Sequence, residues 1–240
     1  MTVEAKIAKD RPRLGGACRV GVAIPAAGTG QRMGGARKLF LQLCGEPVLL
    51  HSLRPFLADS RVISVCVALA LDDAEQPPEW LTSVDERVVI VKGGATRGAS
   101  VVAAIAALDD VDVIAVHDAA RPLVTAEVVS ACIDRTAQGH GVVAGCPAVD
   151  TMKVVDDTGR ILSTADRATL WHAHTPQVFP ADVLRAAYAS GDDNATDDAA
   201  LVESQGGIIE MVDDGGLNLK VTRLSDLTIA EAVLRARADE

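Results

Sequence analysis

The segment Pro25-Ala26-Ala27-Gly28-Thr29-Gly30-Gln31-Arg32-Met33-Gly34-Gly35 has the composition of a phosphate-binding loop. Glycine and alanine let backbone N–H groups approach a phosphate without obstruction from larger side chains. Arg32 adds a guanidinium suited to bidentate phosphate contact, and Lys38 adds a second cation. The alternative is a tight turn after a strand with solvated basic residues, and the segment alone leaves both interpretations open.

Spacing excludes two common types of phosphate loop. A dinucleotide-binding fingerprint requires G-x-G-x-x-G, but position 33 is Met. A P-loop requires G-x-x-x-x-G-K followed by Ser or Thr, and the chain contains no such run. The segment therefore predicts a phosphate loop of another type.

A second polar motif, His117-Asp118-Ala119-Ala120-Arg121-Pro122, follows the apolar stretch Asp112–Val116. A carboxylate with small neighbours at the end of a strand suits a metal ion or a ribose hydroxyl, so Asp118 is a candidate metal ligand. Arg121 is expected to pair with an acid. For His117 we favour packing or hydrogen bonding over catalysis.

The elements that position these motifs alternate along the chain. Runs rich in Val and Ile predict strands buried on both faces at Cys18–Ala26, Val62–Leu69, Arg87–Val91, Asp112–Val116 and Gly141–Gly145. Helices are predicted at Pro47–Ala58, Thr96–Leu108, Thr125–Gln138, near Pro180–Ser190, from Thr196 and from Ser225, with a further strand at Gly207–Val212. This alternation predicts a Rossmann-like α/β fold whose mostly parallel sheet is covered by helices on both faces. Ligands of such sheets bind beyond the carboxyl ends of the strands, where both motifs lie.

Residues 150–166 break the alternation. Thr151–Val155 and Arg160–Thr164 flank Asp156-Asp157-Thr158-Gly159, a turn signal, and predict a projecting β-hairpin. An isolated hairpin is marginally stable in water, so this one is expected to pack on another surface such as a second subunit. We therefore expect a flexible N-terminal extension over 1–17 and a single domain over 18–240, with 147–167 as a projecting dimerisation arm.

Composition narrows the possible functions. The 240 residues include 33 acidic and 23 basic side chains, a formal charge of −10, and only 2% aromatics, which disfavours nucleic acid as a partner. No apolar run approaches the roughly 18–20 residues of a membrane span, and the first residues lack a secretory signal, so a cytoplasmic protein without a membrane partner is expected. The five cysteines contain no C-x-x-C pair, which suggests neither a zinc site nor a disulfide framework.

Six motifs in a fixed order make the chain resemble the 2-C-methyl-D-erythritol 4-phosphate cytidylyltransferase family. They are A-A-G-x-G-x-R-M from Ala26, H-D-A-A-R-P from His117, Asp150-Thr151-Met152-Lys153, Asp166-Arg167 with Leu170-Trp171-His172-Ala173-His174-Thr175-Pro176-Gln177, Thr196-Asp197-Asp198-Ala199, and Asn218-Leu219-Lys220-Val221-Thr222. The resemblance covers roughly residues 20–230 and implies a nucleotidyltransferase version of the fold. It implies transfer of CMP from CTP to 2-C-methyl-D-erythritol 4-phosphate in the non-mevalonate isoprenoid pathway, with a divalent metal, usually Mg²⁺, and a homodimer that exchanges an extended β-arm.

The resemblance also implies roles for individual residues. Arg32 and Lys38 would stabilise the transition state and the leaving pyrophosphate, while Arg167 and Lys220 would grip the phosphate of the second substrate. Nucleotide binding would fall to Ala26, Ala27, Gly28, Gly30, Gly94, Ser100 and Asp118. Thr151, Thr175 and Thr196 would donate hydroxyl groups to the second substrate, although Gly94, Ser100 and Thr196 also suit a loop and helix caps. Thr151 and Arg167 belong to the arm, so the partner subunit is expected to supply them.

Two departures from the family pattern leave alternatives open. Arg37-Lys38-Leu39 stands where the family usually has Pro-Lys-Gln, so Arg37 rivals Lys38, and Arg223-Leu224 follows the last motif where a proline is frequent. A ribitol 5-phosphate cytidylyltransferase shares most of these motifs. Transfer from UTP or GTP to another sugar phosphate, and a nucleotide-binding protein without catalysis, are the remaining alternatives.

Overall fold

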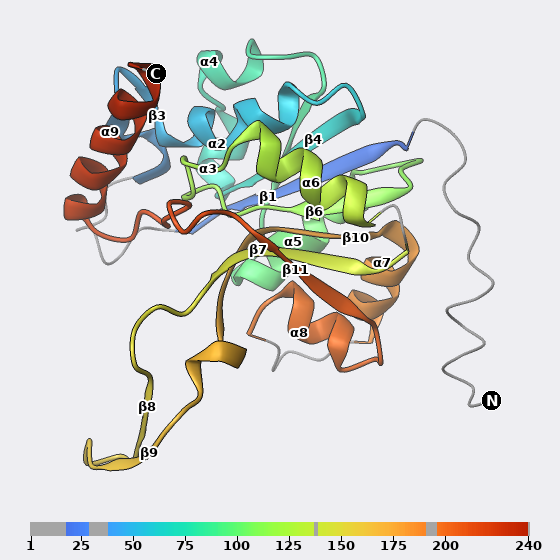
Figure 1. Ribbon diagram of the computed structural model, residues 1–240. Helices are drawn as coiled ribbons and strands as arrows, with labels where there is room; N and C mark the ends of the chain where they lie inside the picture. Colours follow the sequence, from blue (N-terminus) through green and yellow to red (C-terminus); the bar gives the residue numbers. More distant parts are fainter. Residues whose placement is uncertain (1–17, 29–37, 137–138, 191–195, 240) are drawn as a thin grey trace.

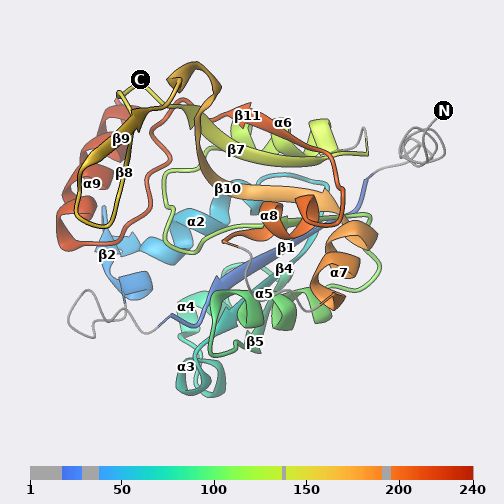
Figure 2. The ribbon, with the colours of Figure 1, turned by 90° about the horizontal axis from the view of Figure 1, so that it is seen from below.

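The computed structural model describes residues 18–28, 38–136, 139–190 and 196–239; the extension predicted over 1–17 lies outside them. Within these residues the main sheet has the order β11-β7-β10-β6-β1-β4-β5. Figure 2 shows this sheet from β11 at one edge to β5 at the other. Its strands are β1 (Val20–Ala26), β4 (Val62–Leu69), β5 (Val88–Lys92), β6 (Val113–Val116), β7 (Gly141–Pro147), β10 (Trp171–Pro180) and β11 (Ile209–Asp213). The pairs β1–β4, β1–β6, β4–β5 and β7–β11 are parallel, which confirms the predicted mostly parallel sheet.

Helices cover both faces of this sheet (Figure 1). On one face lie α2 (Val48–Leu57) and α6 (Ala126–Thr136), which bury Leu53, Phe56 and Ile133 against the strands. On the other lie α5 (Arg97–Ala106), α7 (Ala181–Ala189) and α8 (Asp198–Glu203), with Val101, Leu184 and Leu201 in a second core. Full burial of such a side chain stabilises the fold by about 1.5–3 kcal/mol, so the two cores fix the sheet from both sides.

Strand β10 was not predicted from the sequence. It pairs antiparallel with both β6 and β7 at the centre of the sheet. Its sequence, WHAHTPQVFP, contains two prolines and no continuous Val or Ile run, so the pattern that reveals the other strands is missing. The expectation that Arg87–Val91 is buried on both faces is also wrong, because β5 is an edge strand and remains partly exposed.

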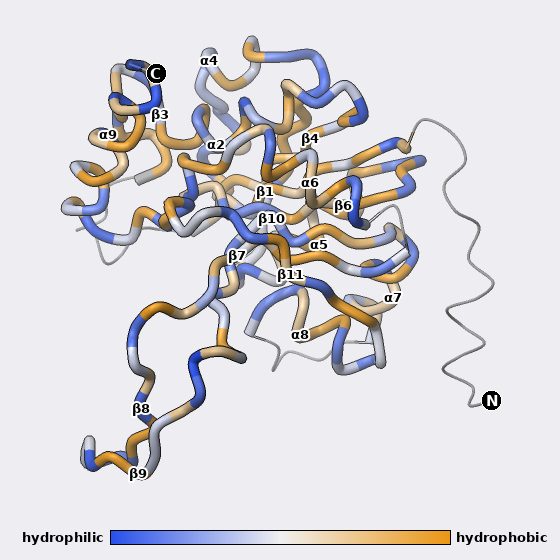
Figure 3. Tube along the Cα trace, viewed as in Figure 1, coloured by the Kyte–Doolittle hydropathy of each residue, from blue (hydrophilic) through white to orange (hydrophobic). Residues whose placement is uncertain are grey.

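The predicted hairpin is confirmed. Strands β8 (Lys153–Val155) and β9 (Ile161–Thr164) pair antiparallel, and the Asp156 carboxylate accepts hydrogen bonds from the backbone of Thr158 and Arg160 to close the turn. The hairpin extends away from the sheet and carries several apolar stretches (Figures 1 and 3). The short 3-10 helix η3 (Arg167–Thr169) lies where the chain returns toward β10.

The remaining elements are short or peripheral. They are η2 (Lys38–Phe40), β2 (Gln42–Leu43), β3 (Glu46–Pro47), α3 (Leu71–Glu75), α4 (Glu79–Thr82) and the final helix α9 (Leu224–Ala238). Helix α9 packs Ala230 with Leu43, Val48 and Leu123 in a third small core. None of the helices in the described part of the chain has the length and apolar character needed to cross a bilayer.

Candidate active site

A pocket of about 280 Å³ opens at the carboxyl ends of the neighbouring strands β1 and β6. It is the place predicted for ligands of a parallel α/β sheet. The described residues that line it are Pro25, Ala26, Ala27, Gly28, Leu39, Gly94, Ala95, Thr96, Arg97, Ser100, Asp118, Ala119, Ala120 and Lys220. Small residues from the loop after β1 therefore face charged residues from three other segments.

The loop between β5 and α5 forms one wall, and its glycines are required by close packing. A Cβ at Gly94 would lie 2.3 Å from the Cβ of Ala99, and one at Gly93 would lie 2.6 Å from the Cβ of Ala27. The Gly94 amide donates to Ser100 Oγ at 3.1 Å, and Thr96 caps α5 by accepting from the Ala99 amide. Backbone atoms of this loop therefore lie at the pocket surface, held there by Ser100 from within.

A chain of ion pairs runs from the lining of the pocket to a buried carboxylate behind it. Lys220 Nζ lies 2.7 Å from Asp118 Oδ2, and Arg97 Nε donates to Asp118 Oδ1 at 3.0 Å. The other end of Arg97 reaches Asp198, with Nη2 to Oδ2 at 2.8 Å. The Tyr188 hydroxyl donates to the remaining oxygen of Asp198. Arg97 thus bridges two carboxylates that are 80 residues apart in the chain, and it holds Asp118 in one orientation.

These contacts keep the acid of the pocket ionised. Burial alone would raise the pKa of Asp118, but the charges of Arg97 and Lys220 outweigh it and lower this pKa well below its usual range. Burial opposes the charged form of Arg97, yet Asp198 and Asp118 raise its pKa. At neutral pH the group is therefore a carboxylate between cations.

His117 and Thr175 hold the backbone beneath this carboxylate. The Asp118 amide donates to Thr175 Oγ1 at 3.0 Å, and Oγ1 lies 3.0 Å from His117 Nδ1, while His117 Nε2 lies 3.2 Å from the Arg121 carbonyl. A neutral ring protonated on Nε2 satisfies all three bonds. Complete burial lowers the pKa of His117 to about 4, which agrees with a neutral ring, and the hydrogen bonds of that ring confirm the predicted hydrogen-bonding role.

Arg121 has the structural role predicted for it. Its guanidinium is buried, donates to the Asn218 carbonyl at 2.7 Å and lies 3.7 Å from Asp118. Asn218 in turn donates to the Thr175 carbonyl at 2.8 Å. The motifs around Asp118, Thr175 and Lys220, which are distant in sequence, are thereby tied together behind the pocket.

The predicted residues do not all meet in one chain. Ala26, Ala27, Gly28, Gly94, Ser100, Asp118 and Lys220 line the pocket. Gly30, Arg32 and the rival Arg37 lie outside the described residues, and Lys38 begins η2. Thr151 and Arg167 lie on the arm, where the Arg167 guanidinium donates to the Val149 carbonyl.

The two other predicted hydroxyl donors have structural surroundings of their own. The Thr175 side chain is buried and bonded to His117 and Asp118, so in this chain its hydroxyl is directed into the protein. Thr196 is exposed and precedes α8, but the cap of that helix is Asp197, which accepts from the Ala200 amide at 2.8 Å. The helix expected from Thr196 therefore begins two residues later, at Asp198.

Three residues of the pocket network were not assigned a role from the sequence: Arg97, Tyr188 and Asp198. One signal was available, since Arg97 opens an otherwise apolar helix, where a cation is unfavourable next to the positive end of the helix dipole. A cation at that position implies an acidic partner. Which acids it meets depends on the tertiary fold, which brings Asp118 from the end of β6 and Asp198 from the start of α8 to the start of α5.

Comparison with known proteins identifies the family. The sequence model of 2-C-methyl-D-erythritol 4-phosphate cytidylyltransferase matches residues 20–236. The chain belongs to this family. Family members from Symbiobacterium thermophilum and Parasynechococcus marenigrum are 41% and 38% identical to it, over 91% and 90% of this chain and 94% and 98% of their own lengths.

Solved structures agree in fold with this cytidylyltransferase family member. The 2-C-methyl-D-erythritol 4-phosphate cytidylyltransferase of Thermus thermophilus superposes with a TM-score of 0.76 at 31% identity, covering 90% of this chain and 99% of the other. The 4-diphosphocytidyl-2C-methyl-D-erythritol synthase of Anaerococcus prevotii superposes with a TM-score of 0.82 at 24% identity, covering 91% and 97%. The fold class predicted from the sequence is confirmed.

Proposed function

We propose that this chain transfers the cytidylyl group of CTP to 2-C-methyl-D-erythritol 4-phosphate, releasing pyrophosphate, in non-mevalonate isoprenoid synthesis. The observation that carries the proposal is the pocket in which the small-residue loop after β1 and the backbone around Gly94 face the Lys220–Asp118–Arg97 chain. Membership of the family supports the choice of both substrates. The likeness of the fold to solved family members supports the same reaction.

In the proposed mechanism a phosphate oxygen of the second substrate attacks the α-phosphorus of CTP in line. Such a reaction needs positioning of the reactants and neutralisation of negative charge more than it needs covalent chemistry. Backbone amides after β1 and around Gly94 would hold the nucleotide, and Arg32 and Lys38 would meet the triphosphate. Lys220, whose side chain is 37% exposed, is placed to turn from Asp118 to an incoming phosphate.

Asp118 also fits a divalent cation such as Mg²⁺. Asp118 is the one acidic residue among the described residues that line the pocket. Mg²⁺ in nucleotide sites is usually held by one or two carboxylates together with substrate phosphates. Both Asp118 oxygens are engaged by cations here, so a metal ion would take the place of one of these contacts. When bound, Mg²⁺ would neutralise charge on the phosphates.

We further propose that residues 18–240 form one domain that dimerises through the arm at 147–167, with Thr151 and Arg167 completing the partner's site. The arm exposes large apolar side chains, which favours a covering partner. They are Val149, Met152, Val154, Val155, Ile161 and Leu162. The free state of all five cysteines supports a cytoplasmic location.

The substrate proposal is tested by pyrophosphate release from CTP with Mg²⁺ and a panel of sugar-alcohol phosphates. Preference for 2-C-methyl-D-erythritol 4-phosphate is expected. Preference for ribitol 5-phosphate, or for UTP or GTP as donor, would replace the proposed substrates. Binding of CTP without release of pyrophosphate would show a protein without catalysis.

Sharing of the site is tested by mixing two inactive variants, Arg167→Ala and Lys220→Ala. If each site takes Arg167 from one subunit and Lys220 from the other, random exchange restores about a quarter of the wild-type activity, because half of the dimers contain one intact site. If both residues act within one chain, no mixture regains activity. Arg160→Ala, an exposed arginine on the same arm, is the matched control and should remain active.

A further inference from the structure

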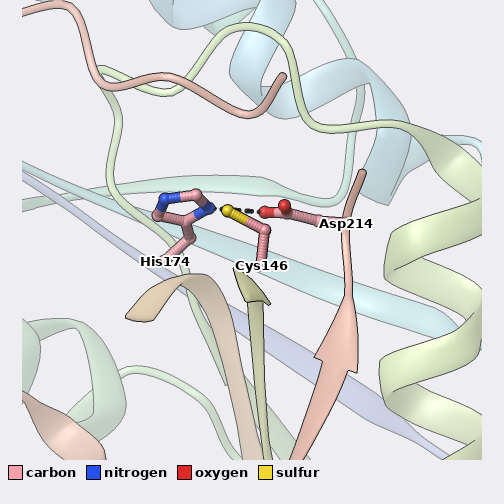
Figure 4. A group of neighbouring side chains, drawn as sticks. All are labelled: Cys146, His174 and Asp214. Atoms are coloured by element: carbon pink, nitrogen blue, oxygen red, sulfur yellow. Dashed lines mark hydrogen bonds and ion pairs between the residues drawn. The ribbon is translucent and has the colours of Figure 1, made fainter. Parts of the chain in front are cut away.

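Three potential metal ligands meet at the root of the arm, outside the pocket described above. Cys146 lies on β7 where the chain leaves for the arm, His174 lies on β10 where it returns, and Asp214 follows β11. Their side chains point toward one another (Figure 4). The Cys146 sulfur, one His174 ring nitrogen and one Asp214 oxygen all lie within 4.8 Å of each other.

The sheet itself brings these residues together. Strands β11, β7 and β10 are consecutive neighbours, and the Asp214 amide donates to the Gly145 carbonyl at 2.8 Å, which places Asp214 beside Cys146. The pairing of β10 with β7 shifts register after Ala173, at the position of His174. A Cβ at Gly145 would lie 2.2 Å from the His172 carbonyl oxygen, so the two strands approach more closely than another residue permits.

The ligand set has the chemistry of a zinc site. Thiolate, imidazole and carboxylate are the ligands of Zn²⁺ in proteins, whereas Mg²⁺ and Ca²⁺ prefer oxygen alone. A Cys146 thiolate and the Asp214 carboxylate would together balance the charge of a divalent ion. The lack of a C-x-x-C pair suggested no zinc site from the sequence, but here the ligands come from β7, from β10 and from the turn after β11 rather than from one short segment.

The carboxylate is already oriented and shielded. Asp214 Oδ2 accepts from Asn218 Nδ2 at 3.0 Å and lies 2.7 Å from His174 Nδ1, and Oδ1 accepts from the Gly216 amide at 3.0 Å. The Asp214 side chain is fully buried, and that of His174 is 15% exposed. Contacts of this kind fix the ligands of a metal site and raise its affinity.

We propose that Cys146, His174 and Asp214 bind one Zn²⁺ per chain, with water as the fourth ligand. Binding releases the thiol proton of Cys146 to solvent and leaves His174 neutral, with its proton on Nε2 and its Nδ1 lone pair on the metal. The ion replaces the direct His174–Asp214 hydrogen bond. It thereby fastens both stems of the arm, at the end of β7 and the start of β10, to the turn after β11.

The test uses untagged, metal-free full-length protein titrated with Co²⁺ as a spectroscopic probe for the zinc site. We expect a thiolate-to-cobalt charge-transfer band that saturates at one ion per chain and is removed by adding Zn²⁺. The band should be lost in Cys146→Ser and retained in Cys44→Ser, a matched control at an exposed free cysteine. Cobalt held at Asp118 gives no such band, since no thiolate lies among the described residues of that pocket.

A second measurement separates metal binding from damage to the fold. Zn²⁺ should raise the melting temperature of the wild type and slow proteolytic cleavage of the arm, and it should do neither in Cys146→Ser or His174→Ala, although both variants melt cooperatively without metal. Zinc affinity should fall at least about tenfold on loss of one ligand. The proposal is overturned if the cobalt band is absent from the wild type or persists in Cys146→Ser, or if Zn²⁺ protects all variants equally.

Discussion

Replacing Arg97 by Met tests the ion-pair chain most directly, because Met keeps much of the side-chain volume while removing the charge. The Asp198 side chain is fully buried, and after the substitution its remaining described side-chain partner is the Tyr188 hydroxyl. Asp118 keeps Lys220 and the more distant Arg121. Removing one partner of a buried ion pair costs about 3–5 kcal/mol. The surviving contacts favour the lower end, roughly 3 kcal/mol, or about 6–12 °C in melting temperature for a chain of this size.

A double-mutant cycle with Asp198→Asn isolates the cause of that loss. The asparagine still accepts a hydrogen bond from Tyr188 but carries no charge, so alone it should cost about 1.5–3 kcal/mol through the lost bond to Arg97. In the double variant no unpaired carboxylate remains at position 198. The double variant should therefore lose less free energy of unfolding than the sum of the two single losses, by at least about 1.5 kcal/mol.

The measurement is the free energy of unfolding from urea titration of all four proteins, followed by two spectroscopic probes. Activity is measured alongside, and Arg97→Met should lower kcat/KM because Asp118 loses one of the contacts that orient it. Additivity within about 0.5 kcal/mol would refute the reasoning, since distant and independent sites behave in that way. A cost below about 1 kcal/mol for Arg97→Met would refute it as well.

Further predictions concern the pocket wall and the groups beneath it. Gly94→Ala should weaken CTP binding at least about tenfold by displacing the loop, while Gly98→Ala, where the nearest atom to a new Cβ is 3.9 Å away, should keep binding unchanged in calorimetry. The pKa of His117 is lowered from 6.5 to about 4, so its contribution to the free energy of unfolding is present above pH 6.5 and is lost as the pH falls toward 4. Urea unfolding at several pH values should show this loss, roughly 3 kcal/mol in all, and the loss should disappear in His117→Gln. Thr175→Val should lose about 2–4 kcal/mol in urea unfolding because it leaves the Asp118 amide and His117 Nδ1 unpaired, whereas Thr175→Ser should retain most of the stability.

The sequence predicts those parts of this fold that depend on local pattern. Strands such as Val62–Leu69 are found because burial on both faces requires a continuous apolar run, and the hairpin is found because its turn needs Asp and Gly. Strand β10 is missed because its place between β6 and β7 is decided by pairing with distant strands and not by its own composition. Its polar residues are explained by the contacts they make, as with Gln177, which accepts from the Ala199 amide.

The candidate site divides in the same way. The small residues after β1 and the position of Asp118 follow from where strands end, so the pocket itself is predictable. The pairing of Arg97 with Asp198 joins positions 101 residues apart, at the starts of α5 and α8, and depends on how the sheet places these two helices on one of its faces. The cluster of Cys146, His174 and Asp214 is equally hidden, because two ligands come from different strands, the third follows another strand, and no spacing rule connects them.

The two cations at hydrogen-bond distance from Asp118, Arg97 and Lys220, are held in different ways. Arg97 is held at both ends, by Asp118 and by Asp198, so it cannot leave without exposing two buried charges. Among the described residues, Lys220 forms an ion pair with one acid, Asp118, and 37% of its side chain is exposed. Under the proposed function, a phosphate entering the pocket would draw Lys220 away while Arg97 continues to neutralise and orient the acid. The fixed arginine keeps Asp118 ionised and in place, and in the proposed reaction Lys220 would be an exposed cation that moves with the substrate.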